Sequence, residues 1–198
     1  MLVELPRFPR APAEVQWKLR QPSQANRSEF TGARRVTILA EAPRWSAQVK
    51  YPPIIGDRAI RPWRAALAMM QGRAGTFRLP AFEESQRAAY GGQSIQVDGA
   101  GQIGGTVNLR GFTHGAYLLI GWFITINDRL HQVVEQVIAG ADGKMAVKVI
   151  PYVAGYGDGA SVETNFPYAL MSLTDDEAGW TVGPGQRYDI AFACEEAF

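Results

Sequence analysis

Apolar and polar residues alternate along many short segments of the chain, the period typical of β-strands with one buried face. The alternation begins in residues 14–21, recurs on both sides of Pro43 and returns in residues 76–80. The apolar positions that share a face are Val15, Trp17 and Leu19; Val36 and Ile38, with Ala40 as the next candidate position; Trp45, Ala47, Val49 and Tyr51; and Phe77 and Leu79. These segments predict the strands of a mainly β protein.

The same alternation closes the chain in residues 187–197. Its two predicted faces are Tyr188, Ile190, Phe192 and Cys194 on one side and Asp189, Ala191, Ala193 and Glu195 on the other. The ends of a chain are poorly ordered unless they dock against other elements. We therefore expect this strand to pack near Trp17, Trp45 and Trp63 and to complete a domain.

One segment has helical spacing. The apolar residues that recur at this spacing are Ile60, Trp63, Ala66 or Leu67, and Met70. We predict a helix that begins at Asp57, as its N-cap, and stops at Gly72. Pro62 fits such a helix only in its first turn.

Residues 92–167 have a different texture, with short apolar segments separated by turn pairs. The turn pairs are Asp98-Gly99, Asn127-Asp128, Asp142-Gly143 and Asp158-Gly159. This spacing predicts a small all-β barrel or sandwich, with a tight hairpin at Asn127-Asp128. We predict an inserted domain of residues 92–167 within a discontinuous outer domain of residues 1–85 and 168–198.

Two segments of the outer domain lack strand patterns. Residues 1–12 are rich in proline and predict an extended arm. Residues 21–33 predict a loop that is long enough to reach a neighbouring molecule.

Composition narrows the class of protein. The 198 residues include 20 basic and 19 acidic residues, a net charge of +1, which gives little reason to expect attraction to nucleic acid or anionic lipid. One cysteine allows no disulfide within the chain. We see no signal peptide and no apolar run long enough to span a bilayer, so we expect a soluble protein made in the cytoplasm.

Histidine and cysteine are too scarce to build an obvious site. His114 and His131, with Asp128, could form a metal or acid–base site, but they lie on different segments and we expect ordinary surface histidines. Cys194 could be a nucleophile, but its place on an apolar face predicts a small buried residue.

The remaining candidates have simpler explanations. The carboxylates Asp175, Asp176, Glu177, Glu195 and Glu196 lack the spacing of a calcium loop, and "TDDE" predicts a solvated turn. "GAGQIGG" precedes a predicted strand rather than a helix, so a phosphate loop is rejected. Six aromatic residues could form a sugar-stacking platform, although we expect half or more in the core: Trp122, Phe123, Tyr152, Tyr156, Phe166 and Tyr168. The sequence thus predicts no catalytic, cofactor-binding or metal-binding residue and no cofactor.

Several longer motifs follow one another in a distinctive order. They are "RWSAQVKYPPI", a helix, "MQGRAGTFRLP", a β insert with "LIGWFITINDRLHQVV" and "DGKMAVKVIPYV", and finally "DDEAGWTV" and "YDIAFACEEAF". This order, over nearly the whole chain, resembles the distal tail (hub) proteins of long-tailed bacteriophages and gene-transfer-agent-like particles. "GRAGTF", "DDEAGW" and the closing "EEAF" are its most specific parts.

The resemblance implies a tail-tube-like β-sandwich or split barrel with one flanking α-helix, plus the inserted β domain. It implies a structural virion protein at the tail tip, without enzyme activity. Such proteins form a ring, commonly a hexamer, between the tail tube protein and the baseplate hub and fibre proteins. DNA passes through the lumen without specific binding, and nothing inserts into a membrane. Phe198 would then lie at a subunit boundary.

Alternatives remain open. The inserted domain could bind host polysaccharide through exposed aromatic residues, or the chain could be another minor tail or tube protein. A cell-wall hydrolase is disfavoured because no paired-carboxylate geometry can be argued. For the structural function we predict an outer-domain core of Trp45, Tyr51, Trp63, Phe77 and Phe192, with Trp180 anchoring the last hairpin. The basic residues expected on surfaces are Arg34, Arg35, Lys50, Arg73 and Arg78.

Overall fold

The computed structural model describes residues 1–9, 11–38, 43–81, 86 and 94–197. The chain divides into two compact units, which we call the sheet unit and the barrel unit. The sheet unit consists of Met1–Leu19, Trp45–Leu79 and Leu170–Phe198, and the barrel unit of Arg20–Arg44 and Pro80–Ala169. Strands dominate both, so the prediction of a mainly β protein is confirmed. The domain boundaries expected from the sequence remain a prediction.

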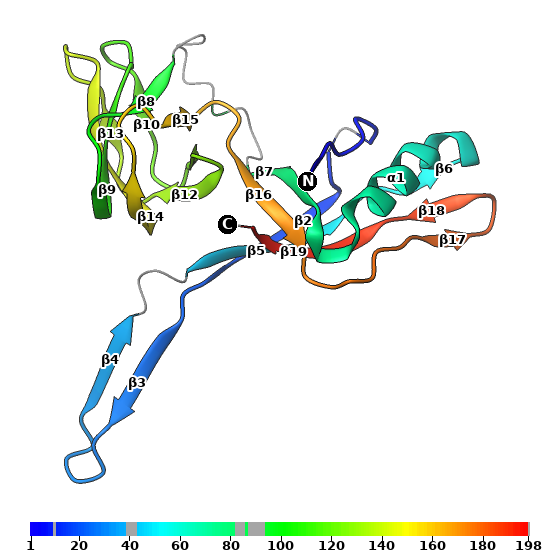
Figure 1. The fold of residues 1–198 in the computed structure, drawn as a ribbon, viewed down its shortest axis with the longest axis horizontal. Helices are drawn as coiled ribbons and strands as arrows, with labels where there is room; N and C mark the ends of the chain where they lie inside the picture. The colour runs from blue at the N-terminus through cyan, green and yellow to red at the C-terminus, as the bar shows by residue number, and fades with distance from the viewer. Residues whose placement is uncertain (10, 39–42, 82–85, 87–93, 198) are drawn as a thin grey trace. The chain divides into compact units, whose positions relative to one another are not determined.

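The sheet unit is built on a six-stranded sheet with the order β1, β7, β16, β19, β5, β2 (Figure 1). The strands span Leu2–Val3 (β1), Thr76–Pro80 (β7), Tyr168–Leu173 (β16), Ala191–Glu196 (β19), Arg44–Lys50 (β5) and Glu14–Arg20 (β2). β19 pairs antiparallel with β16 on one edge and with β5 on the other. The closing segment is therefore docked in the middle of the sheet, as its alternation predicts. Phe198, and Ala40 from the predicted strand before Pro43, lie outside the described residues.

The first residues of the chain belong to this sheet. β1 pairs in parallel with β7, and the side chain of Val3 is buried. The indole N–H of Trp63 donates a hydrogen bond of 2.7 Å to the carbonyl oxygen of Phe8. The sheet and the helix thus hold this segment at Val3 and Phe8, and the extended arm remains a prediction.

The core of the sheet unit contains the aromatic residues predicted for it, with one exception. Trp45, Tyr51, Trp63 and Phe77 are buried. Phe192 is only half-buried, although its ring packs edge-on against Phe77 with 5.6 Å between ring centroids.

The helix α1 spans Asp57–Met70 and covers part of this core. Its buried residues are the predicted ones: Ile60, Trp63, Ala66, Leu67 and Met70. The ring of Trp63 lies 4.3 Å from that of Tyr51, between centroids, which joins the helix to the end of β5. The helix ends just before Gly72, as predicted, and a short 3₁₀ helix, Gly72–Ala74, follows.

The beginning of α1 differs from the prediction in two ways. The N-cap is Gly56, and Asp57 is the first helical residue. The Asp57 carboxylate instead binds Arg61 at 2.7 Å and Arg64 at 2.9 Å, which holds the pKa of Asp57 below its usual value. Pro62 lies beyond the first turn, on the exposed side of the helix, where its ring meets solvent rather than the core.

A second sheet of the same unit has the order β17, β18, β6. Its strands span Thr181–Gly183 (β17), Arg187–Asp189 (β18) and Ile54–Ile55 (β6). The segment predicted as one closing strand is thus two strands, β18 and β19, joined at Ile190. The carbonyl of Ile190 accepts the N–H of Tyr51 at 3.0 Å, where the chain changes from one set of partners to the other.

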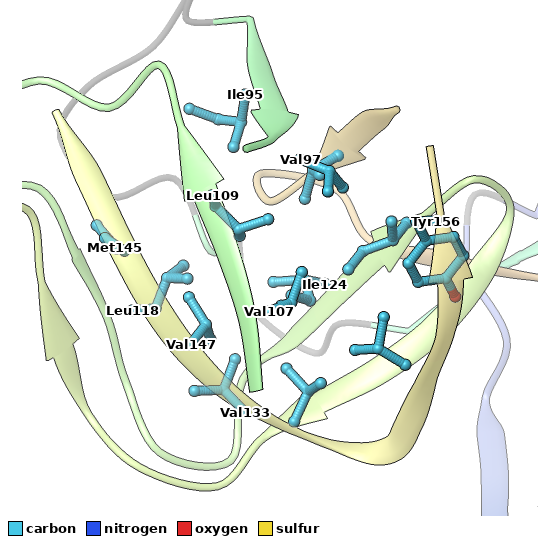
Figure 2. Packing of buried hydrophobic residues seen from close by; sticks show 14 of the residues in the cluster. Ile95, Val97, Val107, Leu109, Leu118, Ile124, Val133, Met145, Val147 and Tyr156 are labelled. Carbon is cyan, nitrogen blue, oxygen red and sulfur yellow. The ribbon is translucent and has the colours of Figure 1, made fainter. Parts of the chain in front are cut away.

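The barrel unit contains a closed six-stranded barrel with the neighbour order β11, β12, β14, β9, β8, β15. The strands span Phe123–Ile126 (β11), Arg129–Val133 (β12), Lys144–Tyr156 (β14), Gln102–Arg110 (β9), Ile95–Val97 (β8) and Ser161–Glu163 (β15). Figure 2 shows branched residues from these strands meeting inside it, among them Val107, Leu109, Ile124 and Val147. Of the two predicted architectures for the insert, the barrel is the one formed.

The turns of the barrel follow the sequence closely. Asn127 and Asp128 have φ values of 49° and 65° and join β11 to β12 in the predicted tight hairpin. "YLLIGWFITIN", predicted as one strand, is two, because the chain turns at Gly121. The first piece, β10 (Tyr117–Leu118), pairs with β13 (Val137–Ile138) in a separate two-stranded ribbon.

Residues 23–38 form a second two-stranded ribbon, which we call the hairpin (Figure 1). Its strands are β3 (Ser23–Arg27) and β4 (Arg34–Ile38). The prediction of a loop over residues 21–33 is therefore wrong. The turn is closed by backbone hydrogen bonds between Ser28 and Gly32 and between Ser28 and Ala33, each 2.9 Å long.

Candidate functional site

The histidines do not form a site with Asp128. His114 is exposed in a loop, whereas the carboxylate of Asp128 accepts a hydrogen bond of 2.6 Å from the hydroxyl of Tyr168. His131 is fully buried in the barrel, so the expectation of a surface histidine is wrong for it. Within the described part of the chain, no three His, Cys, Asp or Glu side chains lie together as metal ligands would.

His131 is buried because both ring nitrogens have partners. Nδ1 donates to the carbonyl oxygen of Pro151 at 2.7 Å, and Nε2 accepts from the hydroxyl of Tyr156, also at 2.7 Å. Burial lowers the pKa of His131 from 6.5 to about 4, so the ring is neutral at pH 7. A neutral imidazole with both nitrogens engaged inside a barrel core is a structural group.

Cys194 is buried on β19, as its place in the alternation predicts. Its thiol points toward the carbonyl oxygen of Ala47 at 3.5 Å. Burial raises the pKa of the Cys194 thiol to about 12. A thiol that stays protonated and covered cannot act as a nucleophile in this conformation.

The carboxylates near the end of the chain separate into two groups. Asp175, Asp176 and Glu177 are exposed in the loop before β17, and Asp176 pairs loosely with Arg73 at 3.4 Å. Glu196 is instead buried at the end of β19, where its carboxylate accepts the backbone N–H of Trp45 at 3.1 Å. The loop is the solvated turn that was predicted, whereas the burial of Glu196 was not predicted.

The glycine-rich segment, residues 99–105, forms the turn between β8 and β9 and the first residues of β9, so a strand and not a helix follows the turn, as predicted. The N–H of Gly99 donates to the carboxylate of Asp158 at 2.8 Å, and Arg110 pairs with the same carboxylate at 2.8 Å. These two donors hold the pKa of Asp158 below its usual value. The amide that a phosphate would need is already bound within the protein.

The six candidate aromatic residues are more exposed than expected. Tyr156 alone of the six is buried; Trp122, Phe123 and Tyr168 are intermediate, and Tyr152 and Phe166 are about half exposed. A methyl group added at Gly105 would lie 3.2 Å from Cε1 of Tyr152, so the Tyr152 ring packs over the Gly105 backbone. One face of this ring remains open on the outside of the barrel.

The hairpin is the most exposed element of the described structure. Every side chain from Ser23 to Thr37 is exposed, and Phe30 at the turn is 99% exposed. The register places Ala25 opposite Val36 and Arg27 opposite Arg34. One face of the hairpin thus combines an apolar pair and two arginines, and Phe30 lies in the turn at its tip.

The charges of the hairpin are unbalanced. It carries Arg27, Arg34 and Arg35 against a single acid, Glu29. None of the three arginines has an ion pair within the described part of the chain. Like charges directly opposite each other destabilise an antiparallel pair. Sequence reasoning found Arg34 and Arg35 but missed Arg27 and Phe30, because the facing of Arg27 and Arg34 depends on the register of the turn.

Two depressions lie on the sheet unit. The first, of about 360 Å³, is lined by β2, β5 and β19 and includes Glu14 and Phe192. The second, of about 460 Å³, is lined by residues 177–181 and by the start of β19. Both include Lys50 and Ala191, so they form one continuous surface, which we call the strip.

The strip has the opposite charge balance to the hairpin. Its lining contains Glu14, Glu177 and Asp189 against one base, Lys50. Trp180, which was expected to anchor the last hairpin, lies at its edge and is 40% exposed. Trp180 contacts the rest of the unit through the Arg64 guanidinium, which lies 5.2 Å from the ring centroids of both Trp180 and Tyr188.

The other basic residues predicted for surfaces, Lys50, Arg73 and Arg78, are also exposed. No helix of the described residues is long and apolar enough to cross a membrane.

No protein-family model matches the chain, and no curated protein matches it either.

Proposed function

We propose that this chain is a structural protein of a bacteriophage tail and assembles into a ring at the distal end of the tail tube. The observation that carries the proposal is the hairpin, whose side chains from Ser23 to Thr37 are all exposed. A lone two-stranded hairpin is marginally stable in water. Its strands gain stability when another molecule covers one of their faces. An arm of this kind suits a protein whose task is assembly.

Two further features support a ring. β2 is an edge strand of the six-stranded sheet, so its outer edge offers backbone N–H and C=O groups to a neighbour. A contact between two different surfaces of identical chains closes into a ring when the rotation between them allows it. A tail-tube-like β-sandwich or split barrel, which the motif order implies, is part of this proposal.

In this proposal the ring is a hexamer at the tip of the virion tail. It joins the tail tube protein to the baseplate hub and fibre proteins, and DNA passes through its lumen without specific binding. The chain has no catalytic role and no cofactor, and it is made in the host cytoplasm. The order of motifs along the chain supports this position.

Two measurements test the proposal. Native mass spectrometry and negative-stain electron microscopy of the purified chain should give closed rings of six subunits. Antibody labelling of tailed particles that carry the chain should mark the tail tip. A chain that remains monomeric at every concentration contradicts the ring, and labelling elsewhere on the particle contradicts the position.

Polysaccharide binding is a second candidate, favoured by Tyr152 alone. Its ring packs over Gly105 with one face open, and flat exposed rings of this kind stack on sugars. A glycan array probed with the whole chain would test it. Tyr152→Ala should abolish binding and Phe166→Ala, which removes an equally exposed ring, should not. Binding that is absent, or unchanged by Tyr152→Ala, contradicts this candidate.

A further inference from the structure

The hairpin and the strip are complementary in charge. The hairpin carries three arginines and one glutamate, and the strip carries three carboxylates and one lysine. Glu14 and Glu177 of the strip have no ion pair within the described part of the chain, as the hairpin arginines also lack one. Complementary patches of this kind steer association and fix its register.

The two surfaces also match in their apolar groups. The face of the hairpin that carries Arg27 and Arg34 also carries Val36, and Phe30 stands at the tip. The strip carries Ala191 and Ala193 in one depression and the 40% exposed ring of Trp180 at the edge of the other. Its second depression has a volume of about 460 Å³ and includes Trp180 beside Glu177 and Asp189, so an apolar group and carboxylates occur on one surface.

We propose that the hairpin of one copy of this chain binds the strip of a second copy. Arg27 and Arg34 lie against the carboxylates of the strip, and Phe30 lies against its apolar residues. The hairpin and the strip are different surfaces, so the contact is heterologous and each copy can bind one neighbour on either side. This inference rests on the proposed function and names the two surfaces that join neighbouring subunits of the ring.

The way the hairpin is joined to β2 and β5 favours a strip on a second copy over the strip of the same chain. The hairpin follows β2 at Arg20 and leads into β5 at Arg44. The strip begins at Glu14 and Lys50, which are the other ends of the same two strands. The residues that connect to the hairpin and the residues of the strip are thus at opposite ends of β2 and β5.

A second copy is also favoured over nucleic acid. A DNA duplex would pair with Arg27 and Arg34 through its phosphates. It would leave Phe30 and Val36 exposed, because phosphate contacts bury no apolar side chain. The strip provides both kinds of contact on one surface.

Reciprocal charge reversal tests the contact. The hairpin variant is Arg27→Glu with Arg34→Glu, and the strip variant is Glu14→Lys with Glu177→Lys. In sedimentation velocity, each variant alone should associate at least about tenfold more weakly than the wild type, because its own two surfaces repel. An equimolar mixture should restore association, because each reversed surface then meets its complement and the two variants alternate around an even-numbered ring.

The control variant is Arg7→Glu with Arg58→Glu, which changes the net charge as much as the hairpin variant at two exposed arginines elsewhere. It should associate like the wild type, and circular dichroism should show every variant folded. Association of the wild type should also weaken as salt rises from about 0.05 to 0.5 M, because screening shortens the range of the attraction.

The outcomes separate the inference from the proposed function. A wild type that never associates contradicts the ring itself. Rings that form equally well from the hairpin variant contradict only the inference, as does a mixture that fails to restore association. A hairpin variant that still forms rings but no longer binds duplex DNA in fluorescence polarisation overturns the inference in favour of nucleic acid.

Discussion

The Nε2 atom of His131 accepts a hydrogen bond of 2.7 Å from the hydroxyl of Tyr156 inside the closed barrel. The pKa of His131 falls from 6.5 to about 4 because burial opposes its charged form. Between these values the unfolded chain binds a proton that the folded chain does not, so stability falls as the pH falls. The free energy of unfolding is therefore not reduced by this site above pH 6.5, and the site lowers it by ~3 kcal/mol at pH 4.

Hydrogen exchange of peptides from β12 and β14, measured by mass spectrometry at several pH values, will show this loss after correction for intrinsic exchange rates. His131→Gln should remove the pH dependence that arises from this site, because glutamine does not titrate. His114→Gln, at an exposed histidine, is the matched control and should leave it in place. A barrel equally protected at pH 4 and pH 7 would contradict the buried neutral ring.

Cys194 should resist thiol reagents while the protein is folded. Burial covers its sulfur and raises its pKa to about 12, so the reactive thiolate is absent near pH 8. Ellman's reagent should give no colour with the native chain and one equivalent of thiol after denaturation. Rapid reaction of the native protein would show that β19 separates readily from β5.

Glu196→Ala should destabilise the sheet unit by about 1–3 kcal/mol. The reason is that the backbone N–H of Trp45 would lose its carboxylate acceptor in a buried place. Glu195→Ala, at the neighbouring and less buried position, should cost less than about 0.5 kcal/mol. Urea unfolding followed by tryptophan fluorescence measures both, and equal losses would contradict the role assigned to Glu196.

Phe77 and Phe192 should differ in their response to truncation, although their rings touch. Phe77→Ala should cost about 3–5 kcal/mol, because the removed ring is wholly enclosed. Phe192→Ala should cost about half as much, because its side chain is only half-buried. Chemical denaturation of the two variants gives the comparison, and a larger loss for Phe192 would refute it.

Gly143→Ala should be among the most damaging single-methyl changes in the barrel. Gly143 has a φ of 69°, and an added Cβ would lie 2.4 Å from the carbonyl oxygen of Phe112. Gly155 has a similar φ of 81° but open space around the same position. Gly155→Ala should therefore cost only the backbone strain of about 1–2 kcal/mol, and thermal melting should show Gly143→Ala to be clearly worse.

Local patterns of residues were enough to predict several elements and the face of each that is buried. The alternation of β5 and the helical spacing of α1 identify their buried residues, because one face of each meets a continuous core. The Asn127-Asp128 turn was predictable because both residues tolerate positive φ. In each case a few neighbouring residues determine the outcome.

Long-range partners explain what the sequence did not reveal. The hydrogen-bond partners of the buried His131 ring are a carbonyl and a hydroxyl that come 20 and 25 residues later in the chain. The buried carboxylate of Glu196 accepts a hydrogen bond from an amide 151 residues earlier. The polar segment of β3 has no alternation at all, so its pairing with β4 depends on the turn at residues 28–33 alone. The acidic side of the strip combines β2, β18 and the loop before β17, which no single stretch of sequence contains.

The central position of β19 determines when the protein can finish folding during translation. β5 and β16 each have an unpaired edge until residues 191–196 have left the ribosome, because only β19 joins them. The last strand of the barrel, β15, is synthesised earlier, so the barrel can close while the sheet is still incomplete. A pause in synthesis between β16 and β19 would leave two open edges of one nascent sheet exposed to other chains.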